Sequence, residues 1–131
     1  MYTLDYEQDT LAFSTAKDEK IRRAKFAMDL YAVADKYQIT RMIPPAAEDF
    51  RTVFGYTTDA DSLEAIIRAH YDIHTQCGHA IGELIASTLF EKHHSFRQSD
   101  EFPPLLRSIP GFASDVALFA HQKGMFKRGY Y

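Results

Sequence analysis

The residues best suited to chemistry are the histidines, five of which fall between positions 70 and 94 of this 131-residue chain. His70 and His74 are one helical turn apart, and two imidazoles at this spacing can chelate zinc from one helix face. Cys77 lies on the same face, but about 10.5 Å along the axis from His70 at about 1.5 Å per residue, too far to share one ion. A third ligand would have to come from elsewhere, and the candidates are His121, Glu48 and Asp49.

A structural role explains the same histidines more simply, and we favour it over metal binding. His70 and His74 fall near the expected C-terminus of a helix, where the helix dipole favours an imidazolium. His79 faces away from His70 if one continuous helix carries both residues. The adjacent His93 and His94 are typical of a solvated helix end. We therefore expect no resident metal and no cofactor.

Nucleophilic catalysis has less support in the sequence. Cys77 has histidines nearby, but it falls among apolar positions, where a thiol is usually unreactive. Neither a Gly-x-Ser-x-Gly elbow nor a glycine-rich phosphate loop is present. Gly78 and Gly82 are small enough to let another backbone approach closely. We therefore expect that the chain is not an enzyme.

The composition predicts a small intracellular protein. The chain is 46% hydrophobic and 25% charged, which allows a modest core. Its net charge is -3 and its basic and acidic residues are interleaved, so no concentrated positive face for nucleic acid is expected. A single cysteine and the lack of a signal-peptide pattern favour a cytoplasmic or nuclear setting. No apolar run approaches the roughly 18 residues of a membrane span.

Helical periodicity dominates the chain, and we expect an all-α fold, an antiparallel stack of about five to six helices. Residues 7 to 18 are expected to form a loop. A first helix is expected from Glu19 to between Tyr37 and Thr40, and its two apolar faces indicate neighbours on more than one side. The second of these faces consists of Phe26, Leu30, Val33 and Tyr37.

Prolines, caps and glycines divide the remainder into further helices. Pro44 or Pro45 is expected to open the second helix, and Gly55 to end it. Asp59, with the preceding threonines, offers a cap for the third helix. A break near Gly78 precedes the fourth helix, and after the polar residues 93 to 100 come a short helix and a last one that begins at Pro110 and stops at Gly124. The inner stripe of the third helix is expected to comprise Leu63, Ile66, Ile67, His70 and Ile73.

Two stretches together resemble part of a BTB/POZ protein. Residues 30 to 39, LYAVADKYQI, followed by Ala47 and Phe50, are similar to the helix pair that closes a BTB/POZ domain. Residues 2 to 6, YTLDY, look like the segment that precedes this pair. Residues 99 to 115, SDEFPPLLRSIPGFASD, resemble a signature in the helical extension of fungal BTB-domain proteins, and residues 66 to 71 fit the intervening helix.

This resemblance implies an organisation in two parts, with residues 1-56 as the closing helices of a BTB/POZ-like fold and residues 57-131 as a BACK-like helical extension packed as one unit. It also implies a non-catalytic adaptor or scaffold, of the kind that recruits substrates to cullin-type ubiquitin ligases or assembles other complexes. Tyr2 and Tyr6 match the segment that the family places near the cullin contact. The alternatives are a metal-binding helical protein that uses His70 and His74, and an unrelated small helical inhibitor of a partner protein.

The family's sheet and dimer-forming helices should precede Tyr2, and they are absent from this sequence. We therefore expect the surface that they would cover to be an exposed apolar patch, with Met28, Tyr31 and Ala32 as its candidates. An exposed apolar patch of this kind predicts self-association or binding of another protein.

Overall fold

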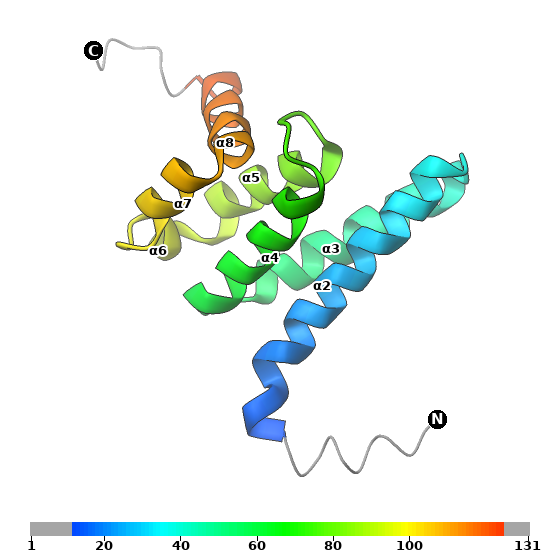
Figure 1. The fold of residues 1–131 in the computed structure, drawn as a ribbon, viewed down its shortest axis with the longest axis horizontal. Coiled ribbons are helices and arrows are strands. Elements are labelled where there is room, and N and C mark those ends of the chain that lie inside the picture. The colour runs from blue at the N-terminus through cyan, green and yellow to red at the C-terminus, as the bar shows by residue number, and fades with distance from the viewer. Residues whose placement is uncertain (1–11, 125–131) are drawn as a thin grey trace.

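The computed structural model describes the backbone of residues 12–124 and the side chains of residues 18–124. Within these residues the chain forms seven α-helices and one 3-10 turn, with no strand (Figure 1). The expected all-α class is confirmed. None of the helices in this part of the chain combines the length and apolarity needed to cross a membrane.

The first two helices form an antiparallel pair. α2 (Ala12–Lys36) is followed by the 3-10 turn η1 (Thr40–Met42), after which α3 (Ile43–Tyr56) returns along α2 (Figure 1). α2 ends because Gln38 takes a positive φ of 58°, which turns the chain and lets the Ile39 N–H donate to the Ala34 carbonyl at 2.8 Å. Prolines occupy the first turn of α3, as expected.

Two expected helix ends in this pair are wrong. α2 begins at Ala12, so residues 12–18 are helical and not part of a loop, because a formed helix extends at little cost through residues of ordinary propensity. α3 continues through Gly55 to Tyr56. Thr57 ends α3 instead, since its hydroxyl and its N–H both donate to the Val53 carbonyl, at 2.8 and 3.1 Å.

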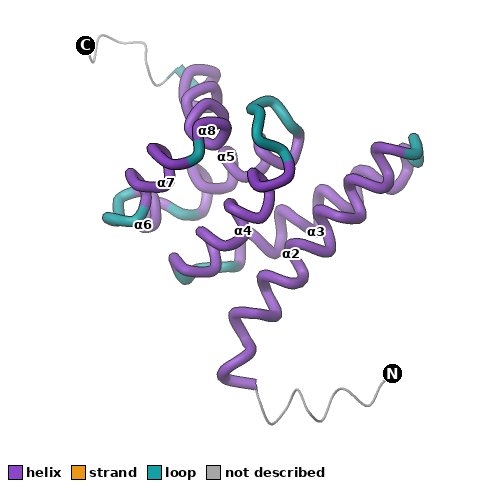
Figure 2. The backbone as a smooth tube through the Cα atoms, in the orientation of Figure 1, coloured by secondary structure: helices purple, strands orange, loops and turns teal. Residues whose placement is uncertain are grey.

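The next two helices are separated by the longest loop between described helices. α4 (Ala60–Ile73) is capped by Asp59, whose carboxylate accepts the Ser62 N–H at 2.9 Å. Residues 74–79 form the loop, drawn in teal between α4 and α5 (Figure 2), and α5 (Ala80–Lys92) follows. Gly78 has a φ of 93°, which confirms the expected break and its dependence on glycine.

Three further helices close the fold: α6 (His94–Arg97), α7 (Phe102–Ser108) and α8 (Pro110–Gln122). The polar residues 93 to 100, expected to separate two helices, therefore contain a helical turn. His93 is buried and its Nε2–H donates to the Phe54 carbonyl at 2.8 Å, so the expected solvated end is wrong for this residue. Phe96 is also buried, and burial of its ring explains why this polar segment folds back onto the protein.

One apolar core joins the helices on both sides of the expected boundary at residue 56. α2 packs against α4, and α3 packs against α5, which also contacts α8. The expected inner stripe of α4 is buried except Ile73, which is 72% exposed because α4 ends there and leaves its core neighbours behind. The largest fully buried apolar residues are Phe50, Phe54, Leu63, Ile66, Ile67, Ile81, Ile85, Leu89, Leu105 and Phe112.

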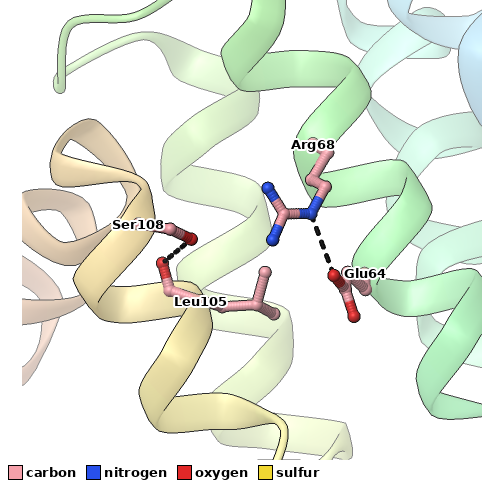
Figure 3. A network of polar contacts seen from close by, with 4 residues as sticks. All are labelled: Glu64, Arg68, Leu105 and Ser108. Carbon is pink, nitrogen blue, oxygen red and sulfur yellow. Dashed lines mark hydrogen bonds and ion pairs between the residues drawn. The ribbon is translucent and has the colours of Figure 1, made fainter.

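The side of α4 that faces α7 shows how polar groups border this core (Figure 3). The Arg68 guanidinium donates to the Glu64 carboxylate on the preceding turn of α4 at 2.9 Å. The buried Leu105 of α7 lies beside this pair. The Ser108 hydroxyl donates back to the Leu105 carbonyl at 3.4 Å. The ion pair lies within α4 and the Ser108 bond within α7, so neither joins the two helices, and an exposed pair at this spacing contributes only about 0.3–0.5 kcal/mol.

Candidate functional site

Three imidazole rings meet where the loop between α4 and α5 turns back. His70 lies in the last turn of α4, His74 follows α4, and His79 precedes α5. The ring centroid of His70 lies 5.1 Å from that of His74 and 5.1 Å from that of His79. The rings of His74 and His79 stack with their centroids 4.1 Å apart. The break at Gly78 lets the chain reverse and brings His79 back to His70. The opposite facing expected for one continuous helix does not apply, because the expected break separates the two residues.

His79 has a defined structural role in this cluster. Its Nδ1 accepts the Ile81 N–H at 3.1 Å, which caps α5. Burial lowers the pKa of His79, and the adjacent His74 lowers it further, while the carboxylates of Asp35 and Asp115 act in the opposite direction. The unprotonated Nδ1 that the cap requires is thus the favoured form.

His70 is the most enclosed member of the cluster. It is only 2% exposed, and its Nε2 has no hydrogen-bond partner in the structure. Burial, followed by the proximity of His79 and His74, lowers its pKa to about 3. The expected imidazolium at the end of α4 is therefore wrong for His70, because desolvation of the ring outweighs the helix dipole.

The three rings of the cluster are not placed to hold one metal ion together. Among the described residues, no three or more His, Cys, Asp or Glu side chains are placed so that they could hold a metal ion. This applies to the expected pair with any of its proposed third ligands. Cys77 is exposed, which corrects its expected place among apolar residues, and no hydrogen bond joins its thiol to a described histidine. Cys77 is therefore not paired with a histidine base among the described residues.

A buried polar contact fixes the other side of the same loop. The Asp115 carboxylate on α8 accepts the Tyr71 hydroxyl and, at 2.8 Å, the Gly78 N–H. Burial and the bond to Asp115 raise the pKa of Tyr71, so its hydroxyl stays protonated. Gly82 passes so close that a Cβ there would lie 2.8 Å from the Tyr71 hydroxyl and nearer still to Asp115. Of the two glycines expected to allow close approach, only Gly82 does so, since nothing lies within 4 Å of a Cβ at Gly78.

A pocket of about 330 Å³ separates the histidine cluster from α2. Met28 and Ala32 line it from α2, with Lys25 and Asp29 beside them. His70, His74 and His79 line the opposite side, together with Ile73. The pocket is large enough for a side chain of another protein or a small molecule, and its polar lining combines the three imidazoles with Lys25, Asp29 and Asp72.

The exposed apolar surface of α2 lies elsewhere, on a face that we call the outer face and define by Phe26, Leu30, Val33 and Tyr37. Phe26 is 67% exposed, Val33 48% and Tyr37 64%, while Leu30 is half-buried. The expected neighbours on more than one side of this helix are α3 and α4, but neither buries the outer face. Three large apolar side chains on one helix face form a surface suited to binding another protein.

The five expected partner-binding residues have different positions. Tyr2 and Tyr6 lie outside the described residues. Met28 and Tyr31 are half-buried and pack against the core, so only part of each side chain is accessible, and their role in binding a partner stays a prediction. Ala32 is exposed and borders the pocket. Helical periodicity identified both apolar faces of α2 but could not tell which of them the rest of the chain covers.

Comparison of the chain with protein-family models, with curated proteins and with solved structures finds no match in any of the three.

Proposed function

We propose that this chain is a non-catalytic protein-interaction module that acts as an adaptor or scaffold. The observation that carries this proposal is the outer face of α2, where Phe26, Val33 and Tyr37 are about half exposed or more. Full burial of such a side chain contributes roughly 1.5–3 kcal/mol, and each of these contributes less because it is already partly buried, so the three together supply a modest apolar contribution to binding.

The structural roles of His70 and His79 in the histidine cluster support the same assignment. His79 is engaged as a helix cap, and His70 is enclosed and holds its neutral form. Neither ring is hydrogen-bonded to a described nucleophile. These imidazoles therefore serve the packing of the loop, and they fit a protein that works by presenting surfaces.

The resemblance to BTB/POZ proteins suggests the kind of complex in which we propose that the chain acts. Residues 30 to 39 include the C-terminal part of α2, and residues 99 to 115 span α7 and the start of α8. Proteins with this signature recruit substrates to cullin-type ubiquitin ligases or assemble other complexes in the cytoplasm or nucleus. We propose the same role here, with the outer face of α2 as the contact surface.

A photo-crosslinking experiment tests the interaction role. A photoreactive amino acid is placed at Val33 and, in a second variant, at Leu118 on α8, because both side chains are 48% exposed. We expect discrete protein adducts in cell extract from position 33 only, and loss of these adducts when Phe26→Asp is added. Equal labelling from both positions, or none from either, would contradict the proposal. Titration with a purified cullin then tests the proposed class of partner.

A further inference from the structure

The outer face of α2 has the spacing of a coiled-coil seam. Phe26, Leu30, Val33 and Tyr37 follow one another at steps of four, three and four residues, which is the a/d spacing of a heptad. At about 100° per residue, the four positions fall within an arc of about 60°. The Tyr37 N–H donates to the Val33 carbonyl at 3.0 Å, so Tyr37 continues the helical hydrogen bonding beyond Lys36. A second apolar helix would fill this seam.

The two flanks of the seam differ in chemistry. On one flank, Ala27 and Ala34 at the e positions are buried within their own chain. On the other flank, Asp29 and Lys36 at the g positions are exposed and carry opposite charges. Neither forms an ion pair with another residue whose side chain the structure describes. An incoming helix therefore meets one open flank, with an acidic and a basic side chain seven residues apart.

We propose that two copies of this chain pair through the outer face of α2, with the two helices antiparallel. In this register Phe26 lies against Tyr37 of the second copy, and Leu30 lies against its Val33, so every step of the seam is filled. The same register places Asp29 beside Lys36 of the second copy, and the two-fold symmetry of the pair repeats this contact. This inference rests on the proposed interaction role and specifies the partner as a second copy of the same chain.

A parallel pair lacks this complementarity. In parallel dimers g positions face e positions, so Asp29 would meet Ala34, which its own chain buries. Only the antiparallel pair joins the two open flanks and their opposite charges. Because the seam extends only from residue 26 to residue 37, its area is small for a permanent dimer, and we expect a reversible, concentration-dependent one.

Sedimentation equilibrium of the full-length chain, from micromolar to millimolar concentration, tests the pairing. We expect a monomer–dimer equilibrium for the unchanged chain. Val33→Asp should weaken dimerisation at least about tenfold, since it places a charge in an apolar seam. Leu118→Asp is the matched control of equal exposure and should dimerise like the unchanged chain. Circular dichroism checks that both variants remain helical. A monomer throughout this range, or a dimer that Val33→Asp leaves intact, would overturn the inference.

Disulfide crosslinking tests the orientation. In a Cys77→Ser background, a chain with Leu30→Cys is mixed with a chain with Val33→Cys. The antiparallel register predicts that mixed crosslinks form faster than crosslinks between identical chains. Faster crosslinking between identical chains would indicate a parallel pair and overturn the register. As a second measure, Asp29→Lys should weaken the dimer, and addition of Lys36→Asp should restore it.

The two proposals fail in distinguishable ways. If the purified chain stays monomeric while photo-crosslinking at position 33 captures a different protein, the second-copy inference is wrong and the interaction role stands. If the chain is monomeric and position 33 captures no protein, both are wrong.

Discussion

At the scale of single residues, Gly82 is a position where buried side chains leave no room for a β-carbon. The Tyr71 hydroxyl and the Asp115 carboxylate occupy the space that a β-carbon would need, and both side chains are buried and bonded to each other. Such a site has little freedom to adjust, because moving either group would break a buried hydrogen bond. Glycine is therefore required at position 82 because there is no space for a side chain. At position 78 it is required because the backbone adopts a positive φ.

We predict that Gly82→Ala destabilises the protein and that Gly55→Ala does not. The added methyl group at position 82 is overpacked, which costs roughly 1–3 kcal/mol and exceeds the roughly 1 kcal/mol gained in helix propensity. At position 55, also within a helix, the nearest atom to the new Cβ is 3.9 Å away, so only the propensity gain remains. Urea denaturation of both variants measures the free energy of unfolding. A Gly82→Ala protein as stable as the unchanged chain would show that this contact is not close-packed.

At the scale of elements, histidines link folding to pH, with His70 and His79 beside the α4–α5 loop and His93 at the end of α5. Burial lowers the pKa values of His70, His79 and His93, so the folded state binds fewer protons than the unfolded state, in which the pKa of a histidine is about 6.5. The resulting stability is fully present above that value. It is lost as the pH falls below it towards the folded pKa, which is about 3 for His70, with a slope of at most about 1.4 kcal/mol per pH unit for each histidine.

We predict that His79→Asn reduces this pH dependence while it preserves the cap of α5. Asparagine is a good N-cap residue and does not titrate, so at pH 7.5 the variant should be nearly as stable as the unchanged chain. His79→Ala removes the cap and should cost about 0.5–2 kcal/mol at the same pH. Unfolding free energies measured between pH 7.5 and 5 should fall less steeply for both variants, with His121→Gln, at an exposed position of α8, as the control. An unchanged slope in His79→Asn would exclude a contribution of this ring.

Local sequence signals predicted the helices well and their neighbours poorly. Some residues determine the backbone conformation only within about one helical turn. These are the prolines of α3 and α8, the Asp59 cap and Gly78 at the break, and each is where it was expected. The burial of Ile73 and the covering of Phe26 depend on which elements pack nearby, and the 3.6-residue period carries no such information. The histidine cluster was missed for a related reason. Its third ring reaches the other two only through a chain reversal, so spacing along one helix could not reveal it.

At the scale of the whole molecule, the expected boundary at residue 56 crosses a continuous core. The helices before it contribute Phe50 and Phe54, and those after it contribute Ile66, Ile85 and Phe112 to the same buried cluster. His93 reinforces the contact, because its ring donates to the Phe54 carbonyl from the other side of the boundary. The division into residues 1-56 and 57-131 stays a prediction from the resemblance. The shared core favours a chain that unfolds as a single cooperative unit.

We predict that a small defect in α5 lowers the stability of α3 by the same amount. Ile85 is fully buried on α5, and Ile85→Val should cost about 0.5–1.5 kcal/mol. If the chain unfolds as one unit, the slowest-exchanging amides of α3 and α5 should lose protection equally in native-state hydrogen exchange. Leu118→Ala, at a half-exposed position, should change neither helix by more than about 0.5 kcal/mol. Loss of protection confined to α5, with α3 unaffected, would mean that residues 1-56 and 57-131 unfold independently and that their shared core does not couple them.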